Sequence, residues 1–499
     1  MEASLNLHEF ENPIPDARLN KLKQLRSKGV DPYPSRYSRT HNSSEATSFY
    51  EDLESSLDEN GQTPEISVAG RITAIRGMGK ATFIDVMDSH GHLQSLARQS
   101  SLSSYSDLRD IDIGDWIGMS GPLMKTRTGQ ITLEIKSWIM LSKSLRPLPE
   151  KWHGLSDVET RYRQRYLDLI ANEDARNIAV LRSKFVSELR QFMQNKNFIE
   201  VETPILVPIA AGGTARPFIT HYNALGRDLY LRIATELYLK RLMVGGLERV
   251  FEIGRTFRNE GLDLHHNPEF TMMESYEAYS NYHDVMEFVE NLIHTLAQTI
   301  LGTSVIKYGG HNIDLTPPWT RLDLRKEIRS KTGIDFLKSN DVESLSLSMK
   351  SIGINVEKQV SWGGMIDKLL SSAIEPHLTQ PVFLVDYPVE MSPLAKTKQE
   401  NPHLAERFEG FIAGMEICNA FTELNDPIDQ RARLEKQEEL RIQFQDEDMD
   451  RLDEDFLTAL EYGMPPTGGL GLGIDRLVML FSGKPSIKEV VLFPQLRNQ

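Results

Sequence analysis

Polar and hydrophobic residues alternate along two neighbouring runs near the middle of the chain, and each run has the pattern of a β-strand. In the first run, every second residue is polar or small: Glu252, Gly254, Thr256, Arg258 and Glu260. After a polar loop, the second run places four residues on one face: Phe270, Met272, Glu274 and Tyr276. Because successive side chains of a strand point to opposite faces, pairing the runs as a hairpin would bring these residues onto one surface.

The chemistry of that surface indicates a ligand site. It combines an arginine fork that suits an oxyanion, a flat ring that suits stacking, and carboxylates that suit ammonium groups. The pattern therefore favours a site for a nucleotide phosphate and an amino-acid-like cation. A buried hairpin whose arginine and glutamate pair with each other is the alternative. The concentration of charged strands, an aromatic residue and a polar loop within residues 251–279 favours the ligand site.

The N-terminal third of the chain shows different patterns. Leucines at helical spacing within residues 15–30 predict a basic helix, which either packs on the next domain or lies beside an RNA backbone. Residues 40–60 are polar and rich in serine, which indicates a loop or a short surface helix. From about 64 to 145, five short alternating runs separated by Gly-containing turns predict a small β-barrel, best matched by an OB-fold. Such barrels bind single-stranded nucleic acid on one face.

Helical and extended patterns are mixed after a Pro-rich junction at residue 146. RYRQRYLDL (161–169) predicts a basic helix, and a long helix follows with apolar residues at helical spacing: Ile178, Leu181, Phe185, Leu189 and Phe192. A strand ended by Pro204, an amphipathic helix at 283–300 and a buried strand within 381–396 come next. We therefore predict an α+β fold with segments at 1–62, 63–146 and 147–499, the last with a helical insertion around 320–380.

Two acidic residues in the run 407–426 pose a geometric question. If this run were one continuous strand, Glu409 and Glu416 would lie on opposite faces. A kink or bulge at Gly414 would be needed to bring both carboxylates to one metal ion. Spacing alone therefore leaves a metal site here undecided.

The run 463–481 contains a glycine pattern followed by a helix. Alternate glycines clear one strand face, so that a flat ligand can lie on the backbone: Gly469, Gly471 and Gly473. Ile474 then begins a helix with Arg476 in its first turn, near the positive end of the helix dipole. The GxGxG spacing differs from the dinucleotide fingerprint GxGxxG, so a Rossmann site is not indicated.

Composition narrows the class of protein. The 499 residues allow two or three domains, and 40% hydrophobic and 25% charged residues are ordinary for a globular enzyme. One cysteine, Cys418, excludes a disulfide framework, and no apolar run or signal pattern predicts membrane association, so we expect a cytoplasmic protein. The net charge of −15 argues against non-specific nucleic-acid binding but allows a local basic footprint. The acidic segment 435–456 is expected to be a solvated helical surface.

Three stretches resemble the signature motifs of one enzyme family. FEIGRTFRNEG with HNPEFTMMESYEAY (251–279) resembles the second motif of class II aminoacyl-tRNA synthetases, in the form that it takes in lysyl-tRNA synthetases. The helix and strand before Pro204 resemble the first motif, and GLGLGIDR (469–476) resembles the third. The resemblance implies an OB-fold anticodon-binding domain, a catalytic domain with a mainly antiparallel sheet flanked by helices, and a homodimer built on the first motif.

The resemblance also implies an activity: ATP-dependent ligation of L-lysine to tRNA(Lys) through a lysyl-adenylate, releasing AMP and diphosphate. The implied ATP contacts, of which the two arginines are the catalytic cations, are Arg258, Glu260, His266, Phe270 and Arg476. Mg²⁺ is assigned by resemblance to Glu409 and Glu416. The implied lysine contacts are Gly213, Glu236, Arg258, Glu274, Tyr276, Asn419, Phe421 and Glu423.

Some of these assignments keep an alternative. The Gly-rich loop AGGTARPF (211–218) is one residue shorter than usual, so Gly212 competes with Gly213. Glu236 lies in the first turn of a predicted helix, where an acid also serves as a dipole partner. The implied anticodon contacts are Arg76, Phe83 and Gln94. Gln130 replaces a frequent glutamate, which leaves recognition of the third anticodon base open.

Other functions remain to be weighed against this one. Aspartyl- and asparaginyl-tRNA synthetases share the same plan, but they need a cation for the substrate side chain where this pocket offers acids. An enzyme that lysylates a protein would not require the N-terminal barrel. A non-catalytic RNA-binding regulator would be expected to lose Arg258, Arg476 or the acids, and all of them are present.

Overall fold

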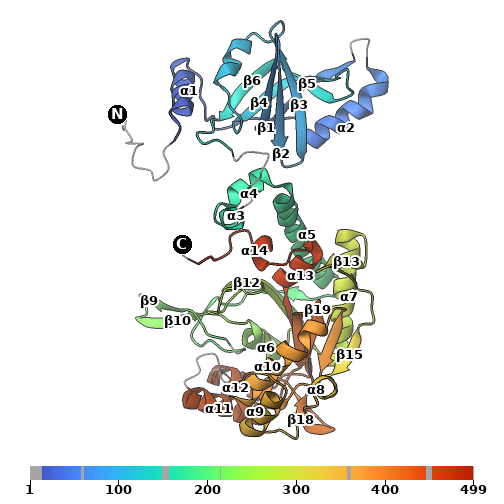
Figure 1. Ribbon diagram of the computed structural model, residues 1–499. Coiled ribbons are helices and arrows are strands. Elements are labelled where there is room, and N and C mark those ends of the chain that lie inside the picture. Colours follow the sequence, from blue (N-terminus) through green and yellow to red (C-terminus); the bar gives the residue numbers. More distant parts are fainter. Residues whose placement is uncertain are drawn as a thin grey trace. The chain divides into compact units, whose positions relative to one another are not determined.

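The computed structural model describes residues 14–57, 61–148, 155, 157–213, 215–356, 361–444 and 452–497. The chain divides into two compact units, Met1–Gly154 and Leu155–Gln499, which are drawn in Figure 1. The junction residues 149–154, Thr214 of the Gly-rich loop and residues 445–451 of the acidic segment lie outside the described residues. The domain boundaries given above remain predictions.

Two α-helices precede the strands in the described part of the first unit. They are α1 (Asp16–Ser27) and α2 (Ser43–Leu53), and both lie where the sequence predicts a helix or allows one. α2 begins with a capping box, in which the Asn42 side chain accepts from the Glu45 N–H and the Glu45 carboxylate accepts from the Asn42 N–H, each at 2.8 Å. These reciprocal bonds explain why a Ser-rich segment begins a helix at this point.

The strands of the first unit form a closed barrel. They are β1 (Gln62–Met78), β2 (Ala81–Asp88), β3 (Gly91–Arg98), β4 (Trp116–Lys125), β5 (Ile131–Glu134) and β6 (Ser137–Ser142). β4 pairs with β1 as well as with β5 and β6, which closes the sheet around a core that includes Ile72, Ile84 and Leu133. The predicted barrel is confirmed. The described barrel has six strands instead of the five expected, because the last run is divided into β5 and β6: the Ile135 N–H donates to Leu96 O of β3, while the Lys136 N–H donates to Ser120 O of β4.

The second unit is built on a large mixed sheet. Among the described residues its strand order is β15-β16-β19-β20-β21-β12-β11-β7, with both edge pairs parallel and the other neighbouring pairs antiparallel. The strands are β7 (Ile199–Glu200), β11 (Arg249–Phe257), β12 (Glu269–Ala278), β15 (Thr320–Asp323), β16 (Val382–Val385), β19 (Arg407–Ile412), β20 (Met415–Thr422) and β21 (Thr467–Gly473). The prediction of a mainly antiparallel sheet in an α+β fold is confirmed.

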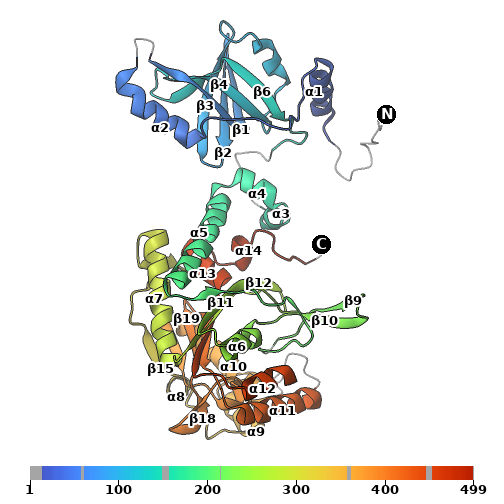
Figure 2. The same cartoon turned by 180° about the vertical axis from the view of Figure 1, so that it is seen from behind.

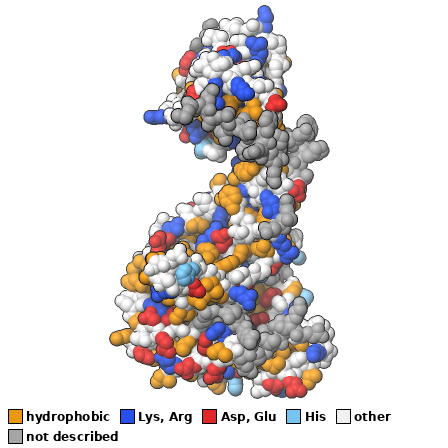
Figure 3. Space-filling view, turned by 90° about the vertical axis from the view of Figure 1, so that its left-hand side faces the viewer, with side chains coloured by type: hydrophobic (Ala, Val, Ile, Leu, Met, Phe, Trp, Pro, Cys, Tyr) orange, Lys and Arg blue, Asp and Glu red, His pale blue; other side chains and the backbone are white. Residues whose placement is uncertain are grey.

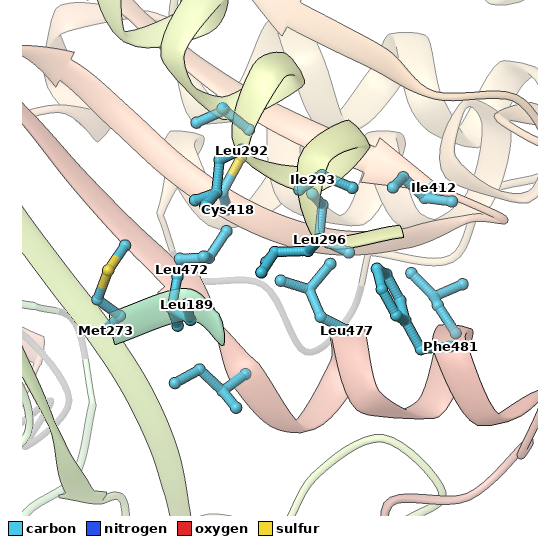
Figure 4. Packing of buried hydrophobic residues seen from close by; sticks show 14 of the residues in the cluster. Leu189, Met273, Leu292, Ile293, Leu296, Ile412, Cys418, Leu472, Leu477 and Phe481 are labelled. Atoms are coloured by element: carbon cyan, nitrogen blue, oxygen red, sulfur yellow. The ribbon is translucent and has the colours of Figure 1, made fainter. Parts of the chain in front are cut away.

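Three helices cover one face of this sheet. They are α5 (Glu173–Asn195), α7 (Tyr282–Leu301) and α13 (Ile474–Ser482). Figure 4 shows their packing against the sheet residues Met273, Cys418 and Leu472, and the labelled helix residues are Leu189, Leu292, Ile293, Leu296, Leu477 and Phe481. Because Met273 and Leu472 point into this core, the residues on either side of them in each strand point to the opposite face.

The opposite face and the edges carry smaller groups of helices. α6 (Glu236–Val244), α11 (Pro427–Phe444) and α12 (Glu454–Glu461) share a second apolar cluster with Val250 and Tyr276. α8 (Leu324–Thr332), α9 (Val342–Ser351) and α10 (Trp362–Ala373) pack against Leu384 and Phe411, which confirms helices within 320–380. A small sheet consists of β8 (Leu206–Val207), β9 (Ile219–Tyr222) and β10 (Arg227–Leu231), of which β9 and β10 extend outward from the second unit in Figure 2.

One helix prediction in this unit is wrong in detail. The basic stretch 161–169 belongs to two short helices, α3 (Val158–Arg163) and α4 (Arg165–Ala171). Gln164 between them has φ −114° and ψ 55°, outside the helical region, so the hydrogen-bonded ladder is interrupted there. Besides the 3-10 helices Glu375–His377 and Val389–Met391, the remaining described elements of this unit are α14 (Ile487–Val490), β13 (Val305–Tyr308), β14 (His311–Asp314), β17 (Thr397–Lys398) and β18 (Asn401–Ala405).

Candidate active site

The central hairpin forms as predicted and provides the floor of the site. β11 pairs with β12 so that Thr256 lies opposite Phe270 and Glu252 lies opposite Glu274. The strand ends at Phe257, however, and the Arg258 N–H donates to Pro268 O at 2.8 Å. The prediction that alternation extends to Glu260 is therefore wrong, because Glu260 is an exposed loop residue whose N–H donates to Arg258 O.

A cluster of buried acidic side chains, called the acidic pocket below, lies between this hairpin and α6. Glu236, Glu274 and Glu423 are 8%, 4% and 1% exposed. Glu274 Oε1 accepts from the Thr235 N–H at 3.0 Å, and the Tyr276 hydroxyl donates to Glu274 Oε2 at 3.4 Å. Burial raises the pKa of Glu274 to about 7, with a further contribution from the charge of Glu236. Carboxylates held in this way suit ammonium groups, which would relieve their desolvation.

Lys240 is a functional candidate that the sequence analysis missed. Its side chain is fully buried, its Nζ donates to Glu236 Oε1 at 2.5 Å, and it forms an ion pair with Glu423 Oε2. Nζ also lies 5.4 Å from the centroid of the Phe421 ring. The i, i+4 spacing of Glu236 and Lys240 on one helix was the available signal, although that spacing usually marks an exposed pair.

The glycines of β21 differ in what they make room for. Gly469 is opposite Tyr276, and a Cβ there would overlap Glu423 Oε1 and lie 2.7 Å from Tyr276 Cε1. At Gly471 the nearest atoms to a Cβ would be Asn419 O at 3.7 Å and Met272 Sδ at 3.8 Å, which are ordinary contacts. The predicted alternation on one face is confirmed, but Gly469 makes room for a carboxylate and a ring of the protein itself.

Arg258 connects the acidic pocket to the aromatic floor. Its guanidinium carbon lies 5.3 Å from the centroid of the Phe270 ring, and its Nε donates to Ile233 O at 3.5 Å. A Cβ on Gly213 would lie 3.9 Å from Arg258 Nη2, whereas one on Gly212 would lie 3.3 Å from Glu236 Cβ. Gly212 has φ +91°, a conformation that favours glycine. Both glycines therefore border the site.

Arg476 lies at the centre of a polar chain beside the sheet. Its Nη1 donates to Glu416 O at 2.6 Å and to Glu416 Oε2 at 3.2 Å. Its Nη2 lies 3.1 Å from His266 Nε2, and His266 Nδ1 lies 2.7 Å from Asp263 Oδ2. In this arrangement His266 Nε2 accepts from Arg476 and Nδ1 donates to Asp263. The loop after β11 and the helix after β21 are thereby joined at a cationic group.

Glu409 and Glu416 reach the same face of the sheet through a bulge, as expected, but the bulge lies at Ile417 instead of Gly414. β19 and β20 form a hairpin whose turn is Ala413 and Gly414, with φ 53° and 74°. The β19–β20 register shifts next to Gly410, so the consecutive residues Ile417 and Cys418 both pack in the core. This bulge returns Glu416 to the face that carries Glu409.

The surroundings of Glu409 orient its carboxylate. Arg407 Nη2 donates to Oε1 at 2.7 Å and the Tyr387 hydroxyl donates to Oε2 at 2.8 Å, while Arg407 Nε donates to Asn419 Oδ1 at 3.1 Å. Burial raises the pKa of Glu409 to about 7; Arg407 opposes the shift and Glu416 adds to it. No cluster of three or more possible protein ligands for a metal occurs in the described part of the chain. Two carboxylates still fit Mg²⁺, which commonly takes its other ligands from water and substrate phosphates.

The candidate anticodon contacts share the outer face of the barrel. Arg76 on β1 lies opposite Phe83 on β2, and Asp85 lies opposite Gln94 on β3. Arg76 Nη1 and Nη2 donate to the Asp85 carboxylate at 2.6 and 3.0 Å, and Gln94 Oε1 accepts from the Thr132 hydroxyl at 2.9 Å. The face thus combines a half-buried ring with amide and guanidinium groups, which suits single-stranded bases. Gln130 is exposed in the turn before β5.

Comparisons with known proteins agree with both units. Residues 157–497 match the family described as tRNA synthetases class II (D, K and N), and residues 66–141 match the OB-fold nucleic acid binding domain. A lysine–tRNA ligase of Dehalococcoides mccartyi is 52% identical over 484 residues, which is 97% of each chain. Those of Carboxydothermus hydrogenoformans and Bacillus subtilis are 51% and 48% identical, and each alignment covers at least 98% of both chains.

The described helices include none that is long and apolar enough to span a membrane. The matched family region covers more than half of the chain and contains the whole of the acidic pocket and both arginines. The chain therefore belongs to the class II tRNA synthetases and, with relatives of about half identical sequence along their full length, to the lysine–tRNA ligase family.

Proposed function

We propose that this chain joins L-lysine to tRNA(Lys) in two steps. In the first, the lysine carboxylate attacks the α-phosphorus of ATP, giving lysyl-adenylate and diphosphate. In the second, the terminal ribose hydroxyl of the tRNA takes the lysyl group and AMP leaves. The observation that carries the proposal is the buried pocket of Glu236, Glu274 and Glu423 next to Arg258. The attacking carboxylate is already a nucleophile, so the first step needs no general base.

Lysine selection follows from the cost of burying an ammonium group. Without partners that cost is several kcal/mol, and paired carboxylates remove it. In our assignment Glu236 receives the α-ammonium group and the other acids, with Tyr276, receive the ε-ammonium group; Gly213, Asn419 and Phe421 complete the lining. A substrate with an acidic side chain would need a free cation. Lys240 does not meet that need, because Glu236 and Glu423 both contact it.

The phosphate groups are assigned to the two arginines. Charge builds on the non-bridging oxygens of the α-phosphate during the first step, and preorganised cations stabilise it. We assign Arg258 to the α-phosphate and the lysine carboxylate, Arg476 to the γ-phosphate, and Phe270 to stacking on adenine, with Glu260 and His266 nearby. Bound Mg²⁺ on Glu409 and Glu416 would neutralise the remaining phosphate charge.

The remaining assignments concern partners. We assign the anticodon to the barrel face of Arg76, Phe83 and Gln94. We also propose a homodimer, supported by hydrophobic side chains that are 46–66% exposed near the first motif: Val180, Ile199, Ile205, Leu206 and Ile219. Figure 3 shows hydrophobic side chains spread over the side of the catalytic unit from which β9 and β10 extend. Light scattering tests the dimer, and a monomer at micromolar concentration would contradict it. A cytoplasmic location remains a prediction based on the sequence.

The exchange of radiolabelled diphosphate into ATP tests the activity. The reaction is run with lysine, aspartate and asparagine in turn, because the matched family includes proteins designated D, K and N. Exchange with lysine alone supports the proposal. Exchange with aspartate or asparagine would contradict the assigned pocket, and no exchange with any amino acid would favour a non-catalytic RNA-binding regulator.

A further inference from the structure

Lys240 has an unusual environment for a lysine on a short helix. Its side chain is fully buried between α6, Phe421 at the end of β20, and Phe456 of α12, whose ring centroid is 5.9 Å from Nζ. A buried ammonium group is costly unless it is paired and hydrogen bonded. Burial alone lowers the pKa of Lys240, but Glu236 and Glu423 outweigh that effect and leave the pKa above its ordinary value. The side chain is therefore a resident cation.

The two partners of Lys240 are the acids assigned to opposite ends of the substrate. Nζ contacts Glu236 Oε1 from within the same helix and Glu423 Oε2 from across the pocket. Each carboxylate uses one oxygen for this bridge. Glu423 Oε1 is buried and accepts no hydrogen bond from the described residues, and it points toward Gly469 and Tyr276. One oxygen of Glu423 is thus fixed by the protein, and the other is directed into the pocket.

The balance of charges in the pocket also indicates a role for Lys240. Glu236, Glu274 and Glu423 carry three negative charges when ionised, and Lys240 supplies one positive charge, while the charge of Arg258 is assigned to the carboxylate and phosphate of the substrates. The remainder of two matches the two ammonium groups of free lysine. Without Lys240, three buried carboxylates would face two ammonium groups, and one carboxylate would lack a partner. A buried carboxylate in that position becomes protonated or moves.

We infer that Lys240 is a positioning residue that determines specificity: by bridging Glu236 and Glu423 it sets the distance between the groups that receive the α- and ε-ammonium ends of the substrate. The inference rests on the proposed function, since it assumes that lysine occupies this pocket. Lys240 does not contact the reacting atoms. Its role is to match the pocket to the length and charge of one diamine-like amino acid.

The test compares Lys240→Met with Lys143→Met in the ATP–diphosphate exchange reaction. Lys143 is a matched control, because it is also fully buried and paired with two acids, Asp112 at 2.6 Å and Asp115 at 2.8 Å, but in the barrel unit. We expect Lys240→Met to raise the lysine KM by about tenfold or more, as truncating one member of a buried charge pair usually does, with an ATP KM changed by less than about twofold. Lys143→Met should leave both KM values unchanged. An unchanged lysine KM in Lys240→Met, or an equal rise in both KM values, would overturn the inference.

Substrate length provides a second measurement. Ornithine is one methylene shorter than lysine, and one methylene is typically discriminated by about 10–200-fold. If Lys240 fixes the separation of Glu236 and Glu423, the preference for lysine over ornithine in kcat/KM should fall by about tenfold in Lys240→Met. A preference equal to that of the unsubstituted protein would mean that Lys240 has no positioning role.

The double variant Lys240→Met with Glu423→Gln covers the case in which the single variant does not fold. If an uncompensated Glu423 causes the loss, removing its charge should restore the fold. The lysine KM of the double variant should then lie within about threefold of that of Glu423→Gln alone, because coupled residues are not additive. A double variant that remains unfolded, or whose two effects on the lysine KM are additive, would contradict the bridge. Absence of lysine-dependent exchange in the unsubstituted protein would instead refute the proposed function itself.

Discussion

The carboxylate of Glu423 occupies the space that a side chain at position 469 would need. A Cβ on Gly469 would overlap Glu423 Oε1 and would lie 2.7 Å from Tyr276 Cε1. Glu423 comes directly after β20, and Gly469 lies in β21 opposite Tyr276 of β12. The glycine in β21 therefore decides where an acid that follows β20 and a ring on β12 can lie.

Gly469→Ala should disturb lysine binding. The new methyl group must displace the Glu423 carboxylate or the Tyr276 ring, and overpacking of this kind costs about 1–3 kcal/mol. We expect the lysine KM in diphosphate exchange to rise by at least about tenfold, which corresponds to about 1.4 kcal/mol. Gly471→Ala is the control, since its Cβ would meet no atom closer than 3.7 Å. Equal lysine KM values for the two variants would contradict this account of Gly469.

The pKa of Glu274 predicts how stability depends on pH in the absence of lysine. Its pKa is raised from 4.5 to about 7 in the folded protein, so between these values the folded state binds more protons than the unfolded state. The stability that Glu274 contributes is complete below pH 4.5 and is lost as the pH rises through 7. Relative to Glu274→Gln, the free energy of unfolding should therefore fall by up to about 3 kcal/mol as the pH increases from about 5 to 8. Urea unfolding of both proteins across this range measures the difference, and parallel pH profiles would contradict the prediction.

The affinity for lysine should increase with pH, whereas the stability of the lysine-free protein should decrease. An ammonium group favours the ionised form of Glu274, and a carboxyl group with a pKa of about 7 is mostly protonated at pH 6 and mostly ionised at pH 8. The Kd for lysine should therefore fall by about tenfold between these two pH values. Calorimetry without ATP isolates this effect from Glu409, whose pKa is also raised to about 7. Glu274→Gln should bind lysine more weakly, with a flatter pH profile, and a Kd independent of pH in the unsubstituted protein would count against the assignment.

The dependence of diphosphate exchange on Mg²⁺ tests the assignment of Glu409 and Glu416 as its ligands. Chelation of divalent ions should abolish diphosphate exchange. Glu416→Gln should raise the Mg²⁺ concentration needed for half-maximal exchange by about tenfold, because removal of a carboxylate ligand weakens a site that has few protein ligands. Lysine binding measured without ATP should remain unchanged. If Glu416→Gln weakens lysine binding and leaves the Mg²⁺ requirement unaltered, the assignment of Glu416 to Mg²⁺ is wrong.

Local patterns predict the central hairpin, the helix that begins at Ile474 and the alternation of the β21 glycines, and all three are observed. These features depend on the spacing of residues close together in the chain, which periodicity reports directly. The ends of strands are harder to predict from the sequence. β11 ends at Phe257, and Glu260 lies in the following loop. A loop begins where hydrogen bonds to neighbouring strands stop, and the sequence does not show which strands are neighbours.

Features that depend on cross-strand register could not be predicted. The two acids of β19 and β20 share a face because Ile417 and Cys418 both pack in the core, which results from a shift in pairing and leaves no clear trace in the sequence. Lys240 was missed for a related reason. A lysine on an amphipathic helix normally points to solvent, and its burial depends on Glu423, which is distant in the chain. The resemblance to a known family identifies such residues only where they belong to its recognised motifs.

Substitution of Phe83 should weaken recognition of tRNA without affecting formation of the adenylate. If a base stacks on this half-buried ring, Phe83→Ala loses an interaction of about 1–3 kcal/mol, so the KM for tRNA should rise by about tenfold or more. Diphosphate exchange requires no tRNA and should be unchanged. Phe83→Leu keeps most of the apolar volume but has no ring face, so it distinguishes stacking from barrel stability. A raised tRNA KM in both variants, together with ordinary unfolding of Phe83→Leu, would identify the ring as a stacking surface. A normal tRNA KM for Phe83→Leu would instead mean that the residue only maintains the barrel, and the anticodon would have to be read elsewhere.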